Sequence, residues 1–147
     1  RGFWPHADAL VFGFPFAWTF GRLGCFSAHD HVGKVSEFAL AVNFPASSYG
    51  GPRHDLGLYE AMWTAVIAAT FYALRKRRVQ PGFFLALWCA MYFPARFGLE
   101  FLRNTDLRGA DVRWIGMTPA QWGSMVLFAG GVWIATRTWS SPAAAEE

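Results

Sequence analysis

The fold follows from the segment Met91-Tyr-Phe-Pro-Ala-Arg96-Phe-Gly-Leu-Glu100-Phe-Leu-Arg103, in which charged residues interrupt an apolar run. An ionised side chain that faces lipid costs about 3 kcal/mol or more, so in a membrane helix it turns toward the protein interior or a wet cavity. The polar residues of the segment recur at helical spacing: Tyr92, Arg96, Glu100 and Arg103. Residues three and four apart share a helix face, so the segment predicts one polar stripe on an otherwise apolar helix.

Hydrophobic stretches at 9–20, 58–74, 83–102 and 120–136 indicate an integral membrane protein. Only 16% of the 147 residues are charged, below the roughly 25% of soluble domains. A crossing needs roughly 20 apolar residues, so three stretches predict full spans. The first stretch is shorter, and we interpret it as a partial span from a helix truncated at the N-terminus. The predicted fold is all-α, a polytopic transmembrane helix bundle with an irregular periplasmic-side loop and a single membrane domain over residues 1–139.

The basic run Arg75-Lys-Arg-Arg78 sets the predicted orientation. Short loops rich in lysine and arginine stay in the cytoplasm. The loops at 21–57 and 103–118 then face outward, and residues 140–147 are predicted to form a disordered cytoplasmic tail. At the second outer loop, Thr118 before Pro119 predicts a helix N-cap followed by the first helical residue.

Two further groups of polar residues lie at the predicted outer boundary. Arg22 is flanked by Gly21 and Gly24, and Arg53-His54 precedes Tyr59-Glu60 at the start of the next span. Several guanidinium groups at one membrane depth favour an anionic lipid headgroup, because planar forks bind phosphate through paired hydrogen bonds. Two alternatives remain open: boundary arginines that extend to headgroups, and a purely structural pair between Arg96 and Glu100.

A metal site is the competing interpretation of the sequence His29-Asp30-His31, with His54 or Asp55 as a further ligand. This spacing on a loop is a weak metal signature without a fixed additional ligand, so we predict no metal and no cofactor. Cys25 and Cys89 lie in different apolar contexts and predict no disulfide framework. The net charge of +3, concentrated between two spans, gives no case for nucleic-acid binding.

Three separated blocks resemble the C-terminal part of the prolipoprotein diacylglyceryl transferase family. Gly21-Arg-Leu-Gly-Cys-Phe26 resembles its GR(I/L)GNF block, and Arg53-His54 with Leu58-Tyr-Glu60 resembles RHPSQLYE. The segment from Arg96 to Arg103, followed by Asp106, resembles FR-x-x-x-EFFR-x-x-D, and the segment from Met117 to Met125 resembles a closing LTMGQ-x-x-S stretch. The order and separations of the blocks also match.

The resemblance implies transfer of a diacylglyceryl group from phosphatidylglycerol to the lipobox cysteine thiol of a preprolipoprotein signal peptide, with release of glycerol phosphate. It implies a multi-pass protein of the bacterial inner membrane with its active site toward the periplasm. Arg22 and Arg96 would grip the lipid phosphate, and Glu100 and Arg103 would form the supporting network. Asp30 aligns with a glutamate of the family and is the fourth predicted catalytic residue. The predicted substrate-binding residues are Arg22, Arg96, Arg103, Cys25, Arg53, His54 and Tyr59.

The chain departs from the family pattern at several positions. Cys25 stands where the block has asparagine, Asp30 where it usually has glutamate, and His54-Asp-Leu-Gly57 replaces HPSQ. The resemblance implies a histidine-glycine stretch as a candidate general base, but that stretch belongs to the N-terminal half of the family and is not in this sequence. The base is therefore unassigned, and three imidazoles could substitute for it: His29, His31 and His54. Two alternative functions follow: an inactive family member that binds anionic phospholipid and, less favoured, a metal-dependent membrane hydrolase.

Overall fold

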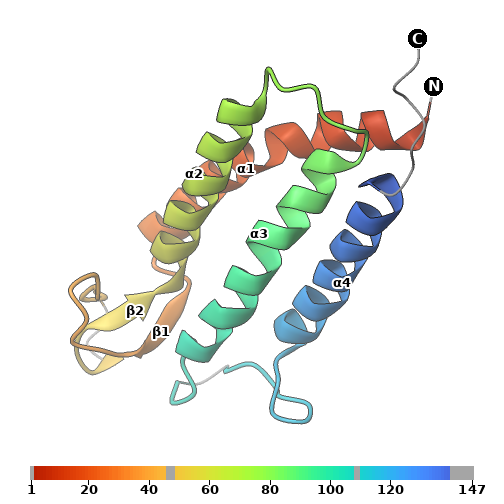
Figure 1. Cartoon of the computed structure of the whole chain (residues 1–147). Coiled ribbons are helices and arrows are strands. Elements are labelled where there is room, and N and C mark those ends of the chain that lie inside the picture. The colour runs from red at the N-terminus through yellow and green to blue at the C-terminus, as the bar shows by residue number, and fades with distance from the viewer. Residues whose placement is uncertain (1, 46–48, 108–109, 140–147) are drawn as a thin grey trace.

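The computed structural model describes residues 2–45, 49–107 and 110–139, and these form four long helices with a small sheet. The helices are α1 (Phe3–Ala28), α2 (Leu56–Leu74), α3 (Phe83–Leu99) and α4 (Pro119–Trp139). The sheet has the strands β1 (Val32–Val35) and β2 (Arg53–Asp55), and a 3-10 turn, η2 (Glu100–Leu102), extends α3. In Figure 1, α2, α3 and α4 stand side by side, α1 crosses behind α2, and the sheet lies at one end.

The first helix is longer than the stretch predicted as a partial span, so the prediction of a partial span is wrong, while the truncation of this helix stays a prediction. α1 has 26 residues and continues through Gly21 and Gly24, which were expected in the outer loop. Each glycine costs about 1 kcal/mol of helix propensity. A Cβ at either glycine would meet nothing within 4 Å, so the contacts of α1 with α2 lie elsewhere on the helix surface. The helix ends where His29 takes a left-handed conformation with φ 54° and its N–H points to the carbonyls of Cys25 and Phe26.

Among the described residues, α1 is the one helix long and apolar enough to cross a membrane by length and composition. The stretches predicted as full spans do form helices, of 19 residues in α2, 17 in α3 and 21 in α4. The mostly helical class is therefore confirmed. The predicted tail at 140–147 lies outside the described residues.

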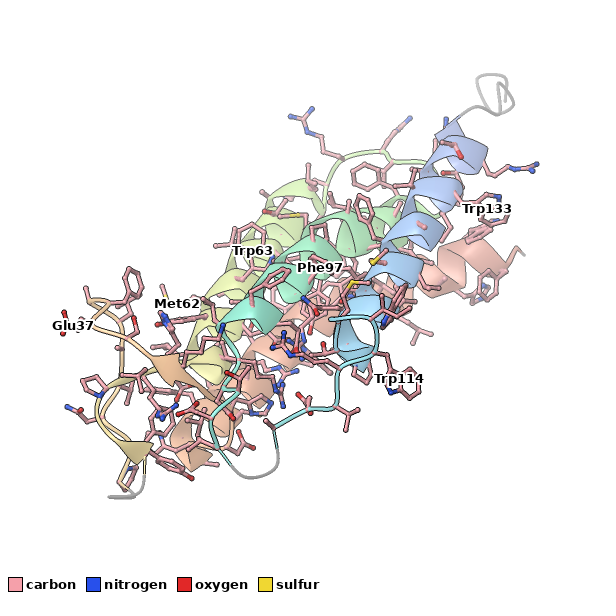
Figure 2. The ribbon with its side chains drawn as sticks, turned by 90° about the horizontal axis from the view of Figure 1, so that it is seen from below. Glu37, Met62, Trp63, Phe97, Trp114 and Trp133 are labelled. Atoms are coloured by element: carbon pink, nitrogen blue, oxygen red, sulfur yellow. The ribbon has the colours of Figure 1, made fainter. Side chains whose placement is uncertain are left out.

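A two-stranded antiparallel sheet within the outer loop corrects the all-α prediction. β1 pairs with β2, and Gly33 also bridges to Arg103 just after α3. A Cβ added at Gly33 would lie 2.7 Å from the carbonyl oxygens of both His54 and Leu102, so only glycine allows these three segments to meet. Figure 2 shows Glu37 at the outer edge of the loop between the strands and Trp114 in the loop before α4.

The core between the helices is aromatic. Its buried members are Ile67, Phe71, Phe84, Trp88, Cys89 and Tyr92. α4 packs against α3 at Gly131, where an added Cβ would lie 2.2 Å from the Cβ of Cys89. This contact requires a residue without a side chain and brings the two helices close together.

Side chains hold the starts of α2, α3 and α4, and at α2 the Asp55 carboxylate accepts from the Leu58 N–H at 3.0 Å. The Thr118 hydroxyl accepts from the N–H of Gln121 at 3.2 Å, and the Gln121 side chain accepts from the Thr118 N–H at 3.0 Å. This reciprocal cap confirms the predicted start of α4 at Pro119. At α3, the carboxylate of Asp8 from α1 accepts from the backbone of Gly82 at 2.7 Å and Leu85 at 3.0 Å.

Candidate functional site

One buried polar centre forms around Glu60, where α1, α2 and α3 meet. Glu60 is 2% exposed, and its carboxylate lies 3.1 Å from Nε of Arg22. The hydroxyl of Tyr92 donates to the same carboxylate oxygen. Glu60 thus neutralises the charge of Arg22 in apolar surroundings, where burying an unpaired guanidinium would cost free energy.

Trp18 packs on this Glu60 centre from the preceding turn of α1. Its indole N–H lies 3.0 Å from the Tyr92 hydroxyl and 3.3 Å from the Glu60 carboxylate. The Arg22 guanidinium carbon sits 5.1 Å from the centre of the Trp18 ring, a cation–π distance. The guanidinium is therefore fixed by charge, hydrogen bonding and stacking together.

A second buried centre forms around Glu100, at the end of α3. Glu100 is fully buried and lies 2.5 Å from Nη1 of Arg96 and 3.4 Å from Nη1 of Arg103. The Thr118 hydroxyl donates to its other oxygen at 3.0 Å. Arg103 also pairs with Asp111 at 2.5 Å. The predicted pair of Arg96 and Glu100 is thus present, together with the predicted participation of Arg103.

The Glu60 and Glu100 centres lie on successive turns of one face of α3. Tyr92 belongs to the first and Arg96 to the second, and four residues of α-helix rise about 6 Å. The crossing at Gly33 joins the loop after α1 to the end of α3, through the bridge to Arg103. Asn104 adds a 2.7 Å hydrogen bond to the carbonyl of Val32. The segments that carry the two centres are therefore tied to one another.

Two predicted site residues, Cys25 and Asp30, and the candidate base His31 lie near Arg22, at the end of α1 and in the loop after it. Nη1 of Arg22 lies 3.0 Å from Nε2 of His31 and 3.9 Å from Sγ of Cys25. Nδ1 of His31 contacts the carboxylate of Asp30. Cys25 is half-buried and Asp30 is exposed, so this group opens from the buried Glu60 centre toward the surface.

Arg53 lies in a structural network rather than on an open surface. It is 3% exposed, its Nη1 and Nη2 reach Asp106 at 3.1 and 2.5 Å, and its Nη1 also donates to the Gly33 carbonyl at 3.0 Å. These hydrogen bonds lower the pKa of the Asp106 carboxyl and raise the pKa of the guanidinium. The predicted direct contact between Arg53 and substrate is therefore less suited to this geometry than a role in holding the sheet.

His54 and Tyr59 form a separate pair. Nδ1 of His54 lies 2.8 Å from the Tyr59 hydroxyl, which is also 3.4 Å from the Leu40 carbonyl. Burial lowers the pKa of His54, so its imidazole is neutral near pH 7. The pair connects β2 and the start of α2 to Leu40 in the loop that follows β1.

The ligands of the alternative metal site do not converge among the described residues. His29 faces Asp55 at 3.7 Å, while His54 pairs with Tyr59. Ligand atoms of Cys25, Asp30 and His31 do lie within 4.8 Å of one another. Arg22 adjoins that group, however, and its fixed positive charge opposes a cation and favours an anion.

Sequence reasoning missed several residues that contact the predicted site residues. Glu60 stood inside a quoted block without a role, and Trp18, Thr118 and Asp106 were not identified as site residues. The signal for Glu60 was available, because an ionisable residue near the start of an apolar helix needs a partner of opposite charge. Trp18 carried no such signal, because tryptophan is common in any membrane helix.

Comparisons with known proteins match most of the chain. A family model described as prolipoprotein diacylglyceryl transferase matches residues 1–137. Relatives named phosphatidylglycerol–prolipoprotein diacylglyceryl transferase include one from Chlorobaculum tepidum, 30% identical over 86% of this chain and 44% of the relative. Those from Solidesulfovibrio magneticus and Pasteurella multocida are 30% and 34% identical over 93% and 72% of this chain, and 52% and 39% of their own lengths. The chain thus spans about half the length of the curated relatives it matches.

Proposed function

We propose, from the premise that this chain belongs to the prolipoprotein diacylglyceryl transferase family, that the protein moves a diacylglyceryl group from phosphatidylglycerol to a thiol. The acceptor is the lipobox cysteine of a preprolipoprotein, and glycerol phosphate is released. The names of the relatives carry the same donor and acceptor. The reaction is one step of lipoprotein maturation.

The observation that carries this proposal is the pairing of Arg22 and Arg96 with two buried glutamates along one face of α3. Arg22 is held by Glu60 and Arg96 by Glu100, at 3.1 and 2.5 Å. When the lipid C–O bond breaks, the departing phosphate gains negative charge. Guanidinium groups fixed beforehand stabilise that charge without reorganising during the reaction.

The supporting roles follow from the contacts. Arg103 and Thr118 hold Glu100, and Tyr92 holds Glu60, so we assign all three to positioning of the arginines. Cys25 and Asp30 border Arg22 on its open side and would face the lipid headgroup or the acceptor peptide. We keep Tyr59 and His54 as binding residues at the edge of the sheet.

The membrane setting is also part of the proposal: a multi-pass bundle of the bacterial inner membrane, with one membrane domain over residues 1–139. The basic turn after α2 lies at the opposite end of α2 and α3 from the sheet, as Figure 1 shows. A cytoplasmic basic turn therefore puts both arginine centres toward the periplasm. Irregular backbone at membrane depth is tolerated where protein covers it, and Gly33 and Arg53 are covered in this way.

A second candidate function is lipid binding without transfer. Cys25 and Asp30 differ from the residues of the resembling blocks, and both lie beside Arg22. In this case phosphatidylglycerol binds and no label reaches a peptide. A metal-dependent hydrolase is less favoured, because the predicted histidine ligands point to different partners.

The test is transfer of label from phosphatidylglycerol to a lipobox peptide by membranes that contain the full-length protein. We expect transfer by the wild type and a loss of about 10²- to 10³-fold in Arg22→Ala and Arg96→Ala, the usual effect of removing a preorganised charge donor. Lys34→Ala is the matched control, because Lys34 is an exposed cation on β1. Unchanged transfer in both arginine variants removes the assigned roles, and binding without turnover in the wild type favours the second candidate.

A further inference from the structure

We propose that His31, oriented by Asp30, is the general base that takes the proton from the acceptor thiol, and that Arg22 covers this base until a lipid phosphate arrives. The inference rests on the proposed transferase function and deepens it. It goes beyond the family resemblance, which left the base of this chain unassigned. It depends on the contacts of one imidazole ring.

The hydrogen-bond partners of His31 determine which ring nitrogen carries the proton. Nη1 of Arg22 lies 3.0 Å from Nε2, and a guanidinium N–H can only donate. Nε2 must therefore present its lone pair, and the proton lies on Nδ1. That nitrogen faces the Asp30 carboxylate, which accepts its hydrogen bond. The ring is thus oriented with Nε2 turned toward Arg22 and Nδ1 toward the carboxylate, the orientation that a carboxylate imposes on a catalytic imidazole.

His31 and Asp30 are accessible from the surface. Their side chains are 22% and 52% exposed, in that order. Within the described part of the chain, the charged and titratable groups beside the ring are Arg22 and Cys25 of α1 and the adjacent Asp30, with Glu60 behind Arg22. The Sγ of Cys25 lies within 4.8 Å of the His31 and Asp30 ligand atoms.

The other two candidate bases have less suitable partners. His29 stacks edge-on against Phe26 and Phe44, and its Nδ1 lies 3.7 Å from Asp55, which is fully buried. His54 is bound to the Tyr59 hydroxyl, away from Arg22. Among the three histidines of this region, His31 alone contacts an arginine proposed to bind the phosphate.

The shared contact with Arg22 couples the base to the lipid. When Nη1 of Arg22 turns to the phosphate, Nε2 of His31 loses its donor and can accept the S–H proton. The thiolate sulfur then forms a bond to the carbon of the diacylglyceryl group that carries the phosphate. The bond between this carbon and the phosphate oxygen breaks, and its electron pair stays on that oxygen of the departing glycerol phosphate. The proton on Nε2 returns to that oxygen or to water, so the ring is neutral again.

The experiment measures kcat/KM for a lipobox peptide from about pH 6 to about pH 10, using the full-length protein in phosphatidylglycerol vesicles. In His31→Gln the amide oxygen still accepts from Arg22, so the KM for phosphatidylglycerol should change by less than about twofold. We expect transfer near pH 7 to fall about 10²- to 10⁴-fold. The deficit should shrink as pH rises past about 8.5, where the thiol ionises without a base.

Two further variants separate a positioning role from a structural one. Asp30→Asn can place an amide N–H against Nδ1 of His31, which moves the ring proton to Nε2. We therefore expect the pH profile of Asp30→Asn to change as that of His31→Gln does. Asp30→Glu should keep the wild-type profile. His29→Asn is the matched control, since asparagine tolerates the left-handed conformation at that position. It should stay within about twofold of wild type at every pH.

The outcomes distinguish the two proposals. A wild type that transfers no label overturns the proposed function and the base with it. A wild type that transfers label, with a His31→Gln deficit that is absent or equal at every pH, overturns the base alone. Loss of wild-type transfer with a chelator and recovery with zinc would also overturn it, because Cys25, Asp30 and His31 would then act as metal ligands.

Discussion

The Glu60 and Glu100 centres each pair a buried carboxylate with arginine, but they take their partners from different parts of the chain. The Glu60 carboxylate binds one arginine, Arg22, together with the Tyr92 hydroxyl and the Trp18 indole N–H. Glu100 instead receives two arginines that lie on its own helix or just after it, and a threonine from the start of α4. The first centre joins distant segments, whereas the second is built largely from neighbours in sequence.

This difference bears on how freely each arginine can act. Arg22 contacts Glu60, His31, Cys25 and the Trp18 ring, so it has to exchange a partner when a phosphate binds. Within the described residues, Arg96 has a single ion pair, with Glu100. Most of its five N–H donors therefore remain for a ligand. We infer that Arg96 binds the lipid phosphate without giving up a partner. Arg22 instead links phosphate binding to the chemical step, because it has to release a partner first.

The largest effect on stability is expected from removing either buried carboxylate. Glu60→Ala and Glu100→Ala each leave a partly buried arginine without its carboxylate, and breaking a buried pair costs about 3–5 kcal/mol, an upper bound for these partly exposed pairs. Glu100→Ala should be the more damaging, because two arginines lose their shared partner. The measurement is thermal unfolding in detergent, with the exposed Glu37→Ala as the control. If all three variants unfold at one temperature, neither centre holds the helices together.

A smaller effect is expected from Tyr92→Phe, which tests the shared character of the Glu60 centre. The ring and its stacking on Trp88 are kept, while the hydroxyl that donates to Glu60 and accepts from Trp18 is lost. A hydrogen bond to a charged group contributes about 1.5–3 kcal/mol, so the free energy of unfolding should fall by about that amount. Tyr72→Phe, at an exposed position of α2, is the control and should unfold like wild type.

The smallest effect is expected from Asp106, whose ion pair lies outside both centres and is half exposed. The hydrogen bond from Arg53 lowers the pKa of the folded Asp106 carboxyl. Its stabilisation is complete above the unfolded pKa, about 3.9, and is lost as pH falls through the lower folded value. Asp106→Asn should therefore reduce the loss of melting temperature between about pH 5 and about pH 3. An identical pH dependence in wild type and variant would show that the pair contributes nothing.

The residues that sequence reasoning placed correctly share one property: their partners lie close in sequence. Arg96, Glu100 and Arg103 were predicted together because helical spacing alone brings them together, and the cap at Thr118 depends on residues three apart. The Glu60 centre could not be assembled in this way, since Arg22 and Glu60 come from helices whose relative rotation no local pattern specifies. The small sheet was missed because its register depends on Gly33, where three distant segments cross.

The contact of Asp8 with the start of α3 has a consequence for how the chain is made. When α1 leaves the ribosome, neither the backbone of Gly82 and Leu85 nor the hydroxyl of Tyr92 has been synthesised. Among the contacts described above, Asp8 therefore lacks its partners until α3 is made, and Arg22 lacks Glu60 until α2 is made. The emergence of α3 supplies the partners for Asp8 and completes the Glu60 centre around Arg22, so these contacts of α1 form only after α3 has been synthesised.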